Sequence, residues 1–285
     1  KQCSMMRLGQ CTAQGARRAS CTVQATQGIA RRSALNLALG SLLLVRPMAA
    51  CAAAKPTSEV EQVLVDPRWP KEFPFKPQDF SRYDEAVDTQ FYNAPRLVMH
   101  IDDSAIAALT EYYKRTFPAS GTPGTAILDI CSSWVSHFPL GYKAGRAAGL
   151  GMNADELKRN DQLTEWVVKD LNLDPKLPFE DNSFDFITNV VSVDYLTQPL
   201  EVFKEMHRCL KPGGTAIMSF SNRCFPTKAI TLWTGTGDPD HVWIVGSYFH
   251  YSVPGGFTEP ACEDISPKLG YRTDPMYIVH ASKVA

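Results

Sequence analysis

Acidic residues are absent from the first 58 positions of this 285-residue chain. The first carboxylate belongs to Glu59, whereas seven Lys and Arg residues precede Lys55. Residues 55–285 therefore hold 22 of the 29 basic and all 30 acidic side chains, a net charge near −8. A body with this charge lacks the general attraction to phosphate on which nucleic-acid binding depends, so we expect no nucleic-acid partner.

Metal-ligand spacings are also missing. The eight cysteines form no CxxC pair and no zinc-binding pattern, so we expect no metal site. Half of them lie within residues 1–54. An oxidising compartment would permit disulfides among the rest, but the sequence does not pair them. The four that follow residue 54 are Cys131, Cys209, Cys224 and Cys262.

No apolar run at the amino-terminal end is long enough to span a bilayer, which takes about 20 apolar residues. Residues 1–30 are rich in Arg, Ser and Ala, which is typical of a transit peptide. Arg31-Arg32, an apolar run at 34–45 and an A-x-A site within 50–54 then form a twin-arginine export signal. We predict that residues 1–54 are a bipartite presequence that directs the chain to the chloroplast and then to the thylakoid lumen. The alternative is a disordered leader with a chance arginine pair.

Residues 55–99 are rich in proline and aromatic residues and show no helical period. Flexible linkers are poor in aromatics, so we predict an extended arm packed over the body of the protein. Asp103 is a suitable N-cap for a helix that runs to Phe117.

The stretch 166–222 sets the fold class. A short apolar run ends at Asp170, a longer β-branched run follows at 184–193, and apolar residues at helical spacing occupy 200–210. Pro-Gly-Gly then stops the helix before a strand at 215–220. With an earlier strand at 125–131, this order predicts a parallel sheet with crossover helices. A helix at 242–251 and two short strands near 261–265 and 276–280 complete the chain.

Two strings in this stretch resemble a known family. DLN…LPFEDNSFD at 170–185 and EMHRCLKPGG at 205–214 are similar to the second half of class I S-adenosylmethionine-dependent methyltransferases, in the branch that acts on quinones and other small molecules. The resemblance covers about residues 100–285. It implies a Rossmann-like α/β fold, with a seven-stranded mostly parallel sheet, an antiparallel closing strand and helices on both faces. It also implies S-adenosyl-L-methionine as the cofactor.

The cofactor loop departs from the family. Asp129 holds the acidic position of the first strand, but Cys131, Ser133 and Val135 occupy the three positions that are usually glycine. These residues lack the free access to positive φ that glycine supplies. Ser132 and Ser133 are instead expected to donate hydroxyls to the cofactor carboxylate, or to cap a following helix.

The resemblance also implies residues for the other parts of the cofactor. Gly151 stands where an acid normally holds the ribose hydroxyls, and Asn153 is a weaker substitute or else the N-cap of a helix at 154–159. Asp170 matches the acid beside the adenine amino group, and Leu171 matches the residue whose backbone amide meets the ring. For Asp170 the alternative is a polar residue that merely ends a strand.

No catalytic residue has a signature. His137, Asn189, Asp194 and Tyr195 lie near the carboxyl ends of strands and are candidates for a proton acceptor, although a lone His or Tyr in a loop is more often structural. The predicted function is methyl transfer to a small phenolic or quinone-like acceptor. The alternative is a non-catalytic methyltransferase-like binding or assembly factor of the thylakoid lumen, which would act on a protein partner.

Overall fold

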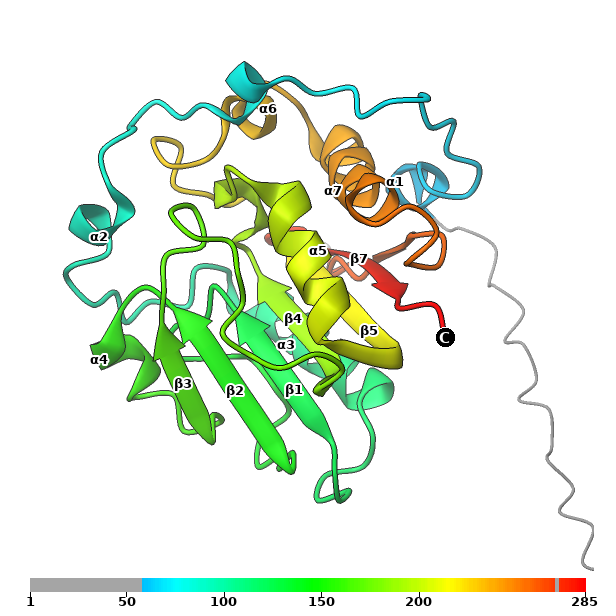
Figure 1. Cartoon of the computed structure of the whole chain (residues 1–285). Coiled ribbons are helices and arrows are strands. Elements are labelled where there is room, and N and C mark those ends of the chain that lie inside the picture. The colour runs from blue at the N-terminus through cyan, green and yellow to red at the C-terminus, as the bar shows by residue number, and fades with distance from the viewer. Residues whose placement is uncertain (1–57, 270–271) are drawn as a thin grey trace, which may run out of the picture. The chain divides into compact units, whose positions relative to one another are not determined.

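The computed structural model of the chain describes residues 58–269 and 272–285, so the predicted presequence lies outside the described residues. Seven strands form one sheet in the order β3-β2-β1-β4-β5-β7-β6 (Figure 1). Their bounds are β1 Ala126–Ile130, β2 Arg146–Gly151, β3 Glu165–Val168, β4 Phe184–Val190, β5 Leu210–Phe220, β6 Ala261–Asp264 and β7 Tyr277–Ser282.

The predicted mostly parallel sheet is confirmed. Strands β1 to β5 pair in parallel, and β7 pairs antiparallel with both β5 and β6. Ile127 lies opposite Phe186, and Val168 and Ile217 lie in the same sheet. The start of β5 differs from the prediction, because the strand begins at Leu210 and includes the Pro-Gly-Gly segment.

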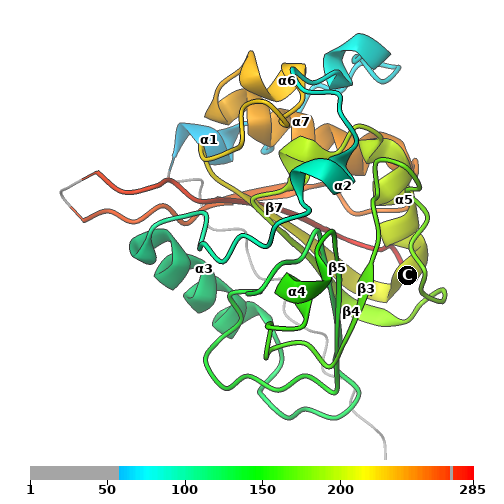
Figure 2. The same ribbon diagram turned by 90° about the vertical axis from the view of Figure 1, so that its left-hand side faces the viewer.

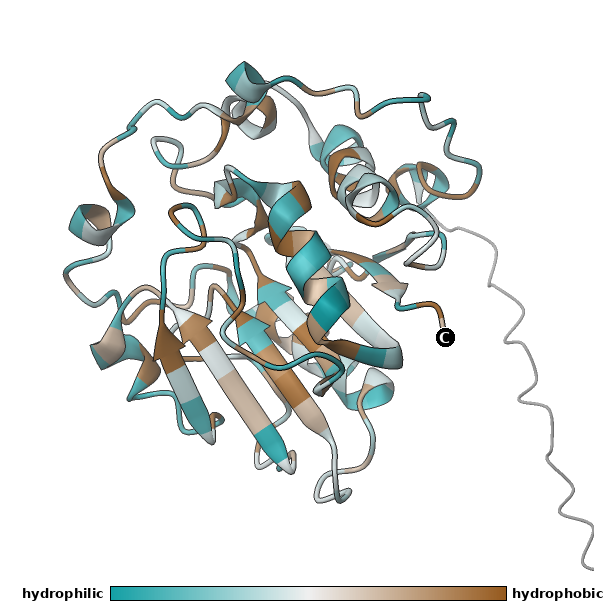
Figure 3. Cartoon of the chain, in the orientation of Figure 1, coloured by the Kyte–Doolittle hydropathy of each residue, from teal (hydrophilic) through white to brown (hydrophobic). Residues whose placement is uncertain are grey.

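Helices cover both faces of the sheet. Figure 2 shows α3 (Asp103–Thr116) on one face and α5 (Pro199–Cys209) on the other. Alternate residues of β1 supply the two cores, because Ile127 packs in the α3 cluster and Leu128 in the α5 cluster. Hydrophobic and hydrophilic residues alternate along α5, as a helix with one buried face requires (Figure 3).

The other helices are short, apart from α7 at Asp238–Ser252. They are α1 Glu59–Gln62, α2 Asp88–Phe91, α4 Ala154–Leu157 and α6 Thr231–Thr234. The N-cap of α3 is Asp102 rather than the predicted Asp103, since the Asp102 carboxylate accepts the Ala105 N–H at 2.8 Å. Within residues 58–269 and 272–285, no helix combines the length and hydropathy that crossing a membrane requires.

Residues 58–99, which we call the arm, run along the body from α1 past α6 to α2 (Figure 1). Trp69 stacks on His250 of α7 with ring centres 4.9 Å apart, and it contacts Trp243 at 5.2 Å. Leu64 is buried in the α5 cluster. Aromatic and aliphatic side chains therefore fasten the first part of the arm to α7.

Candidate cofactor and active site

The carboxyl ends of the parallel strands open into a cavity of about 770 Å³. Its wall includes the ends of β1, β2 and β4, the segment after β3, and part of the arm. Open parallel sheets bind ligands at these strand ends, and small-molecule sites occupy about 300–1,000 Å³. Six of the seven predicted cofactor residues line the cavity: Asp129, Cys131, Ser132, Ser133, Asp170 and Leu171.

The Asp129 carboxylate is enclosed by hydroxyl groups. Its Oδ1 accepts from Thr188 at 2.8 Å, and its Oδ2 accepts from Ser132 at 2.6 Å and from Ser136 at 2.7 Å. Burial raises the pKa of Asp129 to about 6, although the three hydroxyl donors act to lower it. Ser132 thus donates its hydroxyl hydrogen within the protein, and the predicted donation from Ser132 to a cofactor carboxylate is not available in this arrangement.

The predicted helix after β1 is wrong, because residues 131–145 form no helix. Pro139 and Gly141, which has a φ of 72°, interrupt helical backbone. Polar side chains hold the segment in its irregular course, since Asn160 donates to the Ser133 carbonyl at 3.0 Å and Gln162 donates to the Phe138 carbonyl at 2.9 Å. A cofactor carboxylate at this turn would therefore meet no helix N-terminus, where anions are usually stabilised.

Strained backbone gathers around the cavity. Within the described part of the chain, five residues other than glycine have positive φ, and four of them line the cavity. Cys131 adopts φ 53° at the first glycine-like position, so the turn keeps the left-handed backbone without the glycine. The other three are His100, His137 and Val191, at φ 66°, 57° and 41°. Such conformations cost about 1–3 kcal/mol each and cluster at functional sites.

Position 151, at the end of β2, can hold only glycine because there is no space for a side chain. A Cβ atom at this position would overlap the backbone carbonyl oxygen of Ser132. The two segments are also joined by a hydrogen bond from the Ser132 N–H to the Leu150 carbonyl at 2.8 Å. The close approach of the β1 turn to β2 thus excludes every side chain, and hence the family's ribose acid, from position 151.

Asn153 is the N-cap of α4, as the alternative interpretation predicted, and it does not line the cavity. Its side-chain oxygen accepts the N–H groups of Asp155 and Glu156. Its side-chain nitrogen donates to the carbonyls of Tyr92 and Asn93 at 2.8 and 3.1 Å. The two bonds from the side-chain nitrogen hold the arm against the start of α4. Together the four bonds use both the oxygen and the nitrogen of the Asn153 side-chain amide.

Asp170 and Leu171 lie together on the cavity wall after β3. Asp170 is half-buried, and its Oδ1 accepts the Asn172 N–H at 2.9 Å. Leu171 is 4% exposed and places apolar surface beside the carboxylate. A carboxylate next to an apolar surface is a suitable environment for a purine ring that carries an amino group.

The arm and α4 contribute cavity residues that the sequence analysis missed. The guanidinium of Arg96 lies 3.8 Å from the centre of the Phe91 ring and 4.8 Å from that of Phe225. The Arg96 backbone N–H donates to Glu156 at 2.6 Å, and both residues line the cavity. No local pattern signals either one, because the arm lacks periodicity and a Glu in a first helical turn is typical of any helix.

Two of the four proton-acceptor candidates line the cavity. His137 and Tyr195 do, whereas Asn189 and Asp194 are buried outside its wall. Burial, and secondarily the nearby His100, lowers the pKa of His137 to about 4, so its imidazole is neutral near pH 7 and only weakly basic. The Tyr195 hydroxyl accepts the Phe225 N–H at 2.8 Å, and burial raises its pKa well above the usual value.

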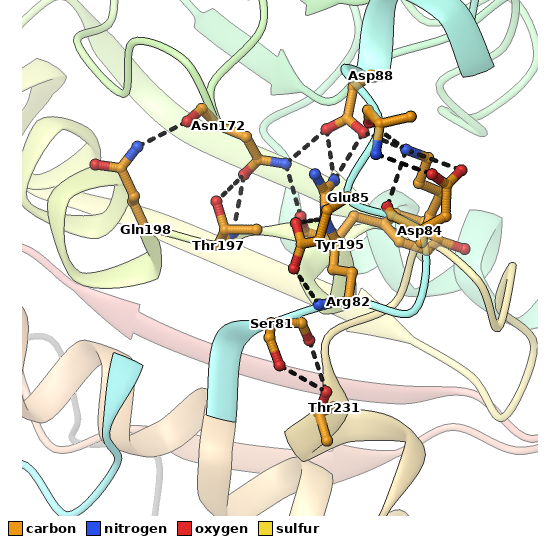
Figure 4. A network of polar contacts seen from close by, with 12 residues as sticks. Ser81, Arg82, Asp84, Glu85, Asp88, Asn172, Tyr195, Thr197, Gln198 and Thr231 are labelled. Atoms are coloured by element: carbon orange, nitrogen blue, oxygen red, sulfur yellow. Dashed lines mark hydrogen bonds and ion pairs between the residues drawn. The ribbon is translucent and has the colours of Figure 1, made fainter. Parts of the chain in front are cut away.

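A buried cluster of ion pairs holds the arm in place beside the cavity. Lys228 is 1% exposed, and its Nζ lies 3.2 Å from carboxylate oxygens of both Asp84 and Asp88. Asp88 also accepts from Arg82 at 2.7 Å and from Asn172 at 2.9 Å (Figure 4). The cluster joins the arm to the segments that follow β3 and β5.

Comparisons with known proteins match part of this domain. A family model described as "Methyltransferase domain" matches residues 146–218. The demethylmenaquinone methyltransferase of Staphylococcus epidermidis is 31% identical over 139 residues, 46% of this chain and 52% of the relative. The malonyl-[acyl-carrier protein] O-methyltransferase of a Marinomonas species is 30% identical over 79 residues, 28% of each chain. The chain thus spans about half the length of the first relative, and less of the second.

Solved structures are similar at lower identity. The S-adenosylmethionine-dependent methyltransferase of Mesorhizobium loti has a TM-score of 0.44 and 19% identity, over 62% of this chain and 98% of that one. Residues 146–218 thus match a methyltransferase domain in sequence, and the seven-stranded, mostly parallel sheet agrees with the Rossmann-like fold that the sequence predicts.

Proposed function

We propose that this chain transfers a methyl group from S-adenosylmethionine to a small phenolic or quinone-like acceptor. The main support is that six residues matched to the family's cofactor site line one cavity, although they come from two separate strand ends. The similarity to a demethylmenaquinone methyltransferase supports a ring-shaped acceptor. The cavity suits a cofactor and a small acceptor together in volume, and its strand-end position agrees with the family.

The residues of the cavity have distinct tasks in this proposal. Asp170 and Leu171 would hold the adenine, and the turn at 131–133 would hold the amino-acid end of the cofactor. S-adenosylmethionine, when bound, supplies a methyl group on a sulfonium centre. The arm covers the site with Tyr92 and Arg96, which limits water and fixes the acceptor in line. For a hydroxyl acceptor, His137 is the candidate base on the cavity wall, and its lowered pKa makes it a weak one.

Replacing Asp170 by alanine tests the cofactor assignment. We expect Asp170→Ala to weaken S-adenosylmethionine binding about tenfold or more, since a hydrogen bond to a charged group contributes about 1.5–3 kcal/mol. Equilibrium dialysis with labelled cofactor measures the change. The control is Asp161→Ala, an exposed residue outside the cavity, which should bind like the wild type. Equal affinity of Asp170→Ala and the wild type would contradict the assignment.

A non-catalytic role is the second candidate, and a specific observation favours it. The turn after β1 has neither the glycines nor the helix N-terminus of an active family member. The Asp129 carboxylate beside this turn already accepts hydrogen bonds from the hydroxyls of Ser132 and Ser136. Such a protein would retain the sheet and the cavity for binding or assembly. The two roles differ in whether S-adenosylmethionine binds.

We also propose that the protein acts in the thylakoid lumen of the chloroplast after removal of residues 1–54. The twin arginine and the acid-free leader support this proposal. Amino-terminal sequencing of the protein isolated from its cells should find a start close to Lys55. A mature chain that retains Arg31-Arg32 would contradict the lumen assignment.

A further inference from the structure

The cavity wall has a carboxylate five residues beyond the end of β2. Position 151 admits no side chain, because a Cβ atom there would overlap the Ser132 carbonyl oxygen. The next carboxylate along the chain that lines the cavity is Glu156, in the first turn of α4. Asp155, its neighbour, is exposed and does not line the cavity.

Glu156 belongs to α4, which contacts β2. Long helical side chains lean toward the amino-terminal end of their helix, and α4 begins only three residues after Gly151. Gly151, Met152 and Glu156 accordingly line the same cavity. The long side chain of Glu156 can therefore reach a region that a side chain on the strand itself cannot enter.

Glu156 is held in place and still has an oxygen to offer. Its Oε1 accepts the Arg96 N–H at 2.6 Å, and within residues 58–269 and 272–285 no hydrogen bond is found for Oε2. The residue is 8% exposed overall. Burial raises the pKa of Glu156, while the Arg96 N–H acts to lower it. A buried carboxylate with one unused oxygen on a cavity wall is suited to accept hydrogen bonds from ligand hydroxyls.

We propose that Glu156 accepts hydrogen bonds from the ribose hydroxyls of the cofactor, replacing the acid that β2 lacks. This inference rests on the proposed function, since it assumes that S-adenosylmethionine occupies the cavity. In this proposal a residue of α4 contacts the ribose. The Arg96 N–H, which belongs to the arm, holds the carboxylate of that residue. The arm is then part of the cofactor site as well as its cover.

The test compares two ligands on three proteins by calorimetry with the full chain. The ligands are S-adenosylhomocysteine and its 2′,3′-dideoxy analogue, which lacks both hydroxyls. The proteins are the wild type, Glu156→Gln and the control Asp155→Asn. Gln keeps the size of the side chain and an oxygen for the Arg96 N–H, but it removes the charge. Binding of the dideoxy analogue reports whether each variant retains a folded cavity.

We expect the wild type and Asp155→Asn to bind S-adenosylhomocysteine about tenfold to a hundredfold more tightly than the analogue. Glu156→Gln should lose most of this preference and bind the analogue like the wild type. A preference that survives in Glu156→Gln would overturn the inference and leave the proposed function intact. A wild type that binds neither ligand would overturn both.

Discussion

Replacing Gly151 by alanine should destabilise the protein by about 3 kcal/mol or more. The added Cβ would overlap the Ser132 carbonyl oxygen, which is backbone and cannot rotate away. Relief would require β2 to separate from the β1 turn, and this would break the hydrogen bond from the Ser132 N–H to the Leu150 carbonyl. Urea unfolding of the two proteins, followed by circular dichroism, measures the difference in free energy.

The matched control is Gly237→Ala. Gly237 precedes α7 at φ −118°, and nothing lies within 4 Å of an added Cβ. Its replacement should change the free energy of unfolding by less than about 1 kcal/mol. If Gly151→Ala unfolds at the same urea concentration as the wild type, the close approach of the two segments is not as described, and an acid could occupy position 151.

Replacing Lys228 by methionine should also have a large effect, a loss of about 3–5 kcal/mol of stability. Lys228 is buried between two carboxylates and donates to the Asp84 and Ala86 carbonyls at 3.2 and 2.6 Å. Methionine fills a similar volume but leaves the two carbonyls without their donor, removes the cation beside Asp84, and leaves Asp88 with Arg82 as its cationic partner. Thermal and urea unfolding measure the loss.

The control for Lys228 is Lys204→Met, which removes an exposed pair. The Lys204 side chain is 64% exposed, and its Nζ lies 3.9 Å from Glu201. Exposed pairs contribute about 0–1 kcal/mol, so this variant should unfold like the wild type. Equal stability of Lys228→Met and Lys204→Met would mean that the buried cluster does not fasten the arm.

The fold was largely predictable from the sequence because it depends on short-range patterns. The apolar runs around Ile127, Phe186 and Ile217 have the length of buried strands, and α5 has a clear helical period. The order of these elements then restricts the topology to a parallel sheet with crossovers. Residue spacing could also place Asp129 and Asp170 at strand ends, and thus on one cavity.

The rest depends on contacts between distant segments, which local patterns do not encode. Residues 131–145 follow β1, where a parallel sheet normally has a crossover helix, yet Asn160 and Gln162 hold them in an irregular course. The partners of Lys228 lie about 140 positions earlier, in an arm without periodicity. Glu156 accepts a hydrogen bond from Arg96, which lies 60 positions earlier in the chain. The donor is a backbone N–H, so the residue type at position 96 does not predict this contact.

Titration of the full chain with S-adenosylhomocysteine in a calorimeter measures whether the cavity binds the cofactor. We expect saturable heat with one site per chain, and competition by S-adenosylmethionine for the same site. Absence of both heat and a thermal shift at millimolar ligand would contradict it. That result would leave the cavity with a different ligand and the chain with a non-catalytic role.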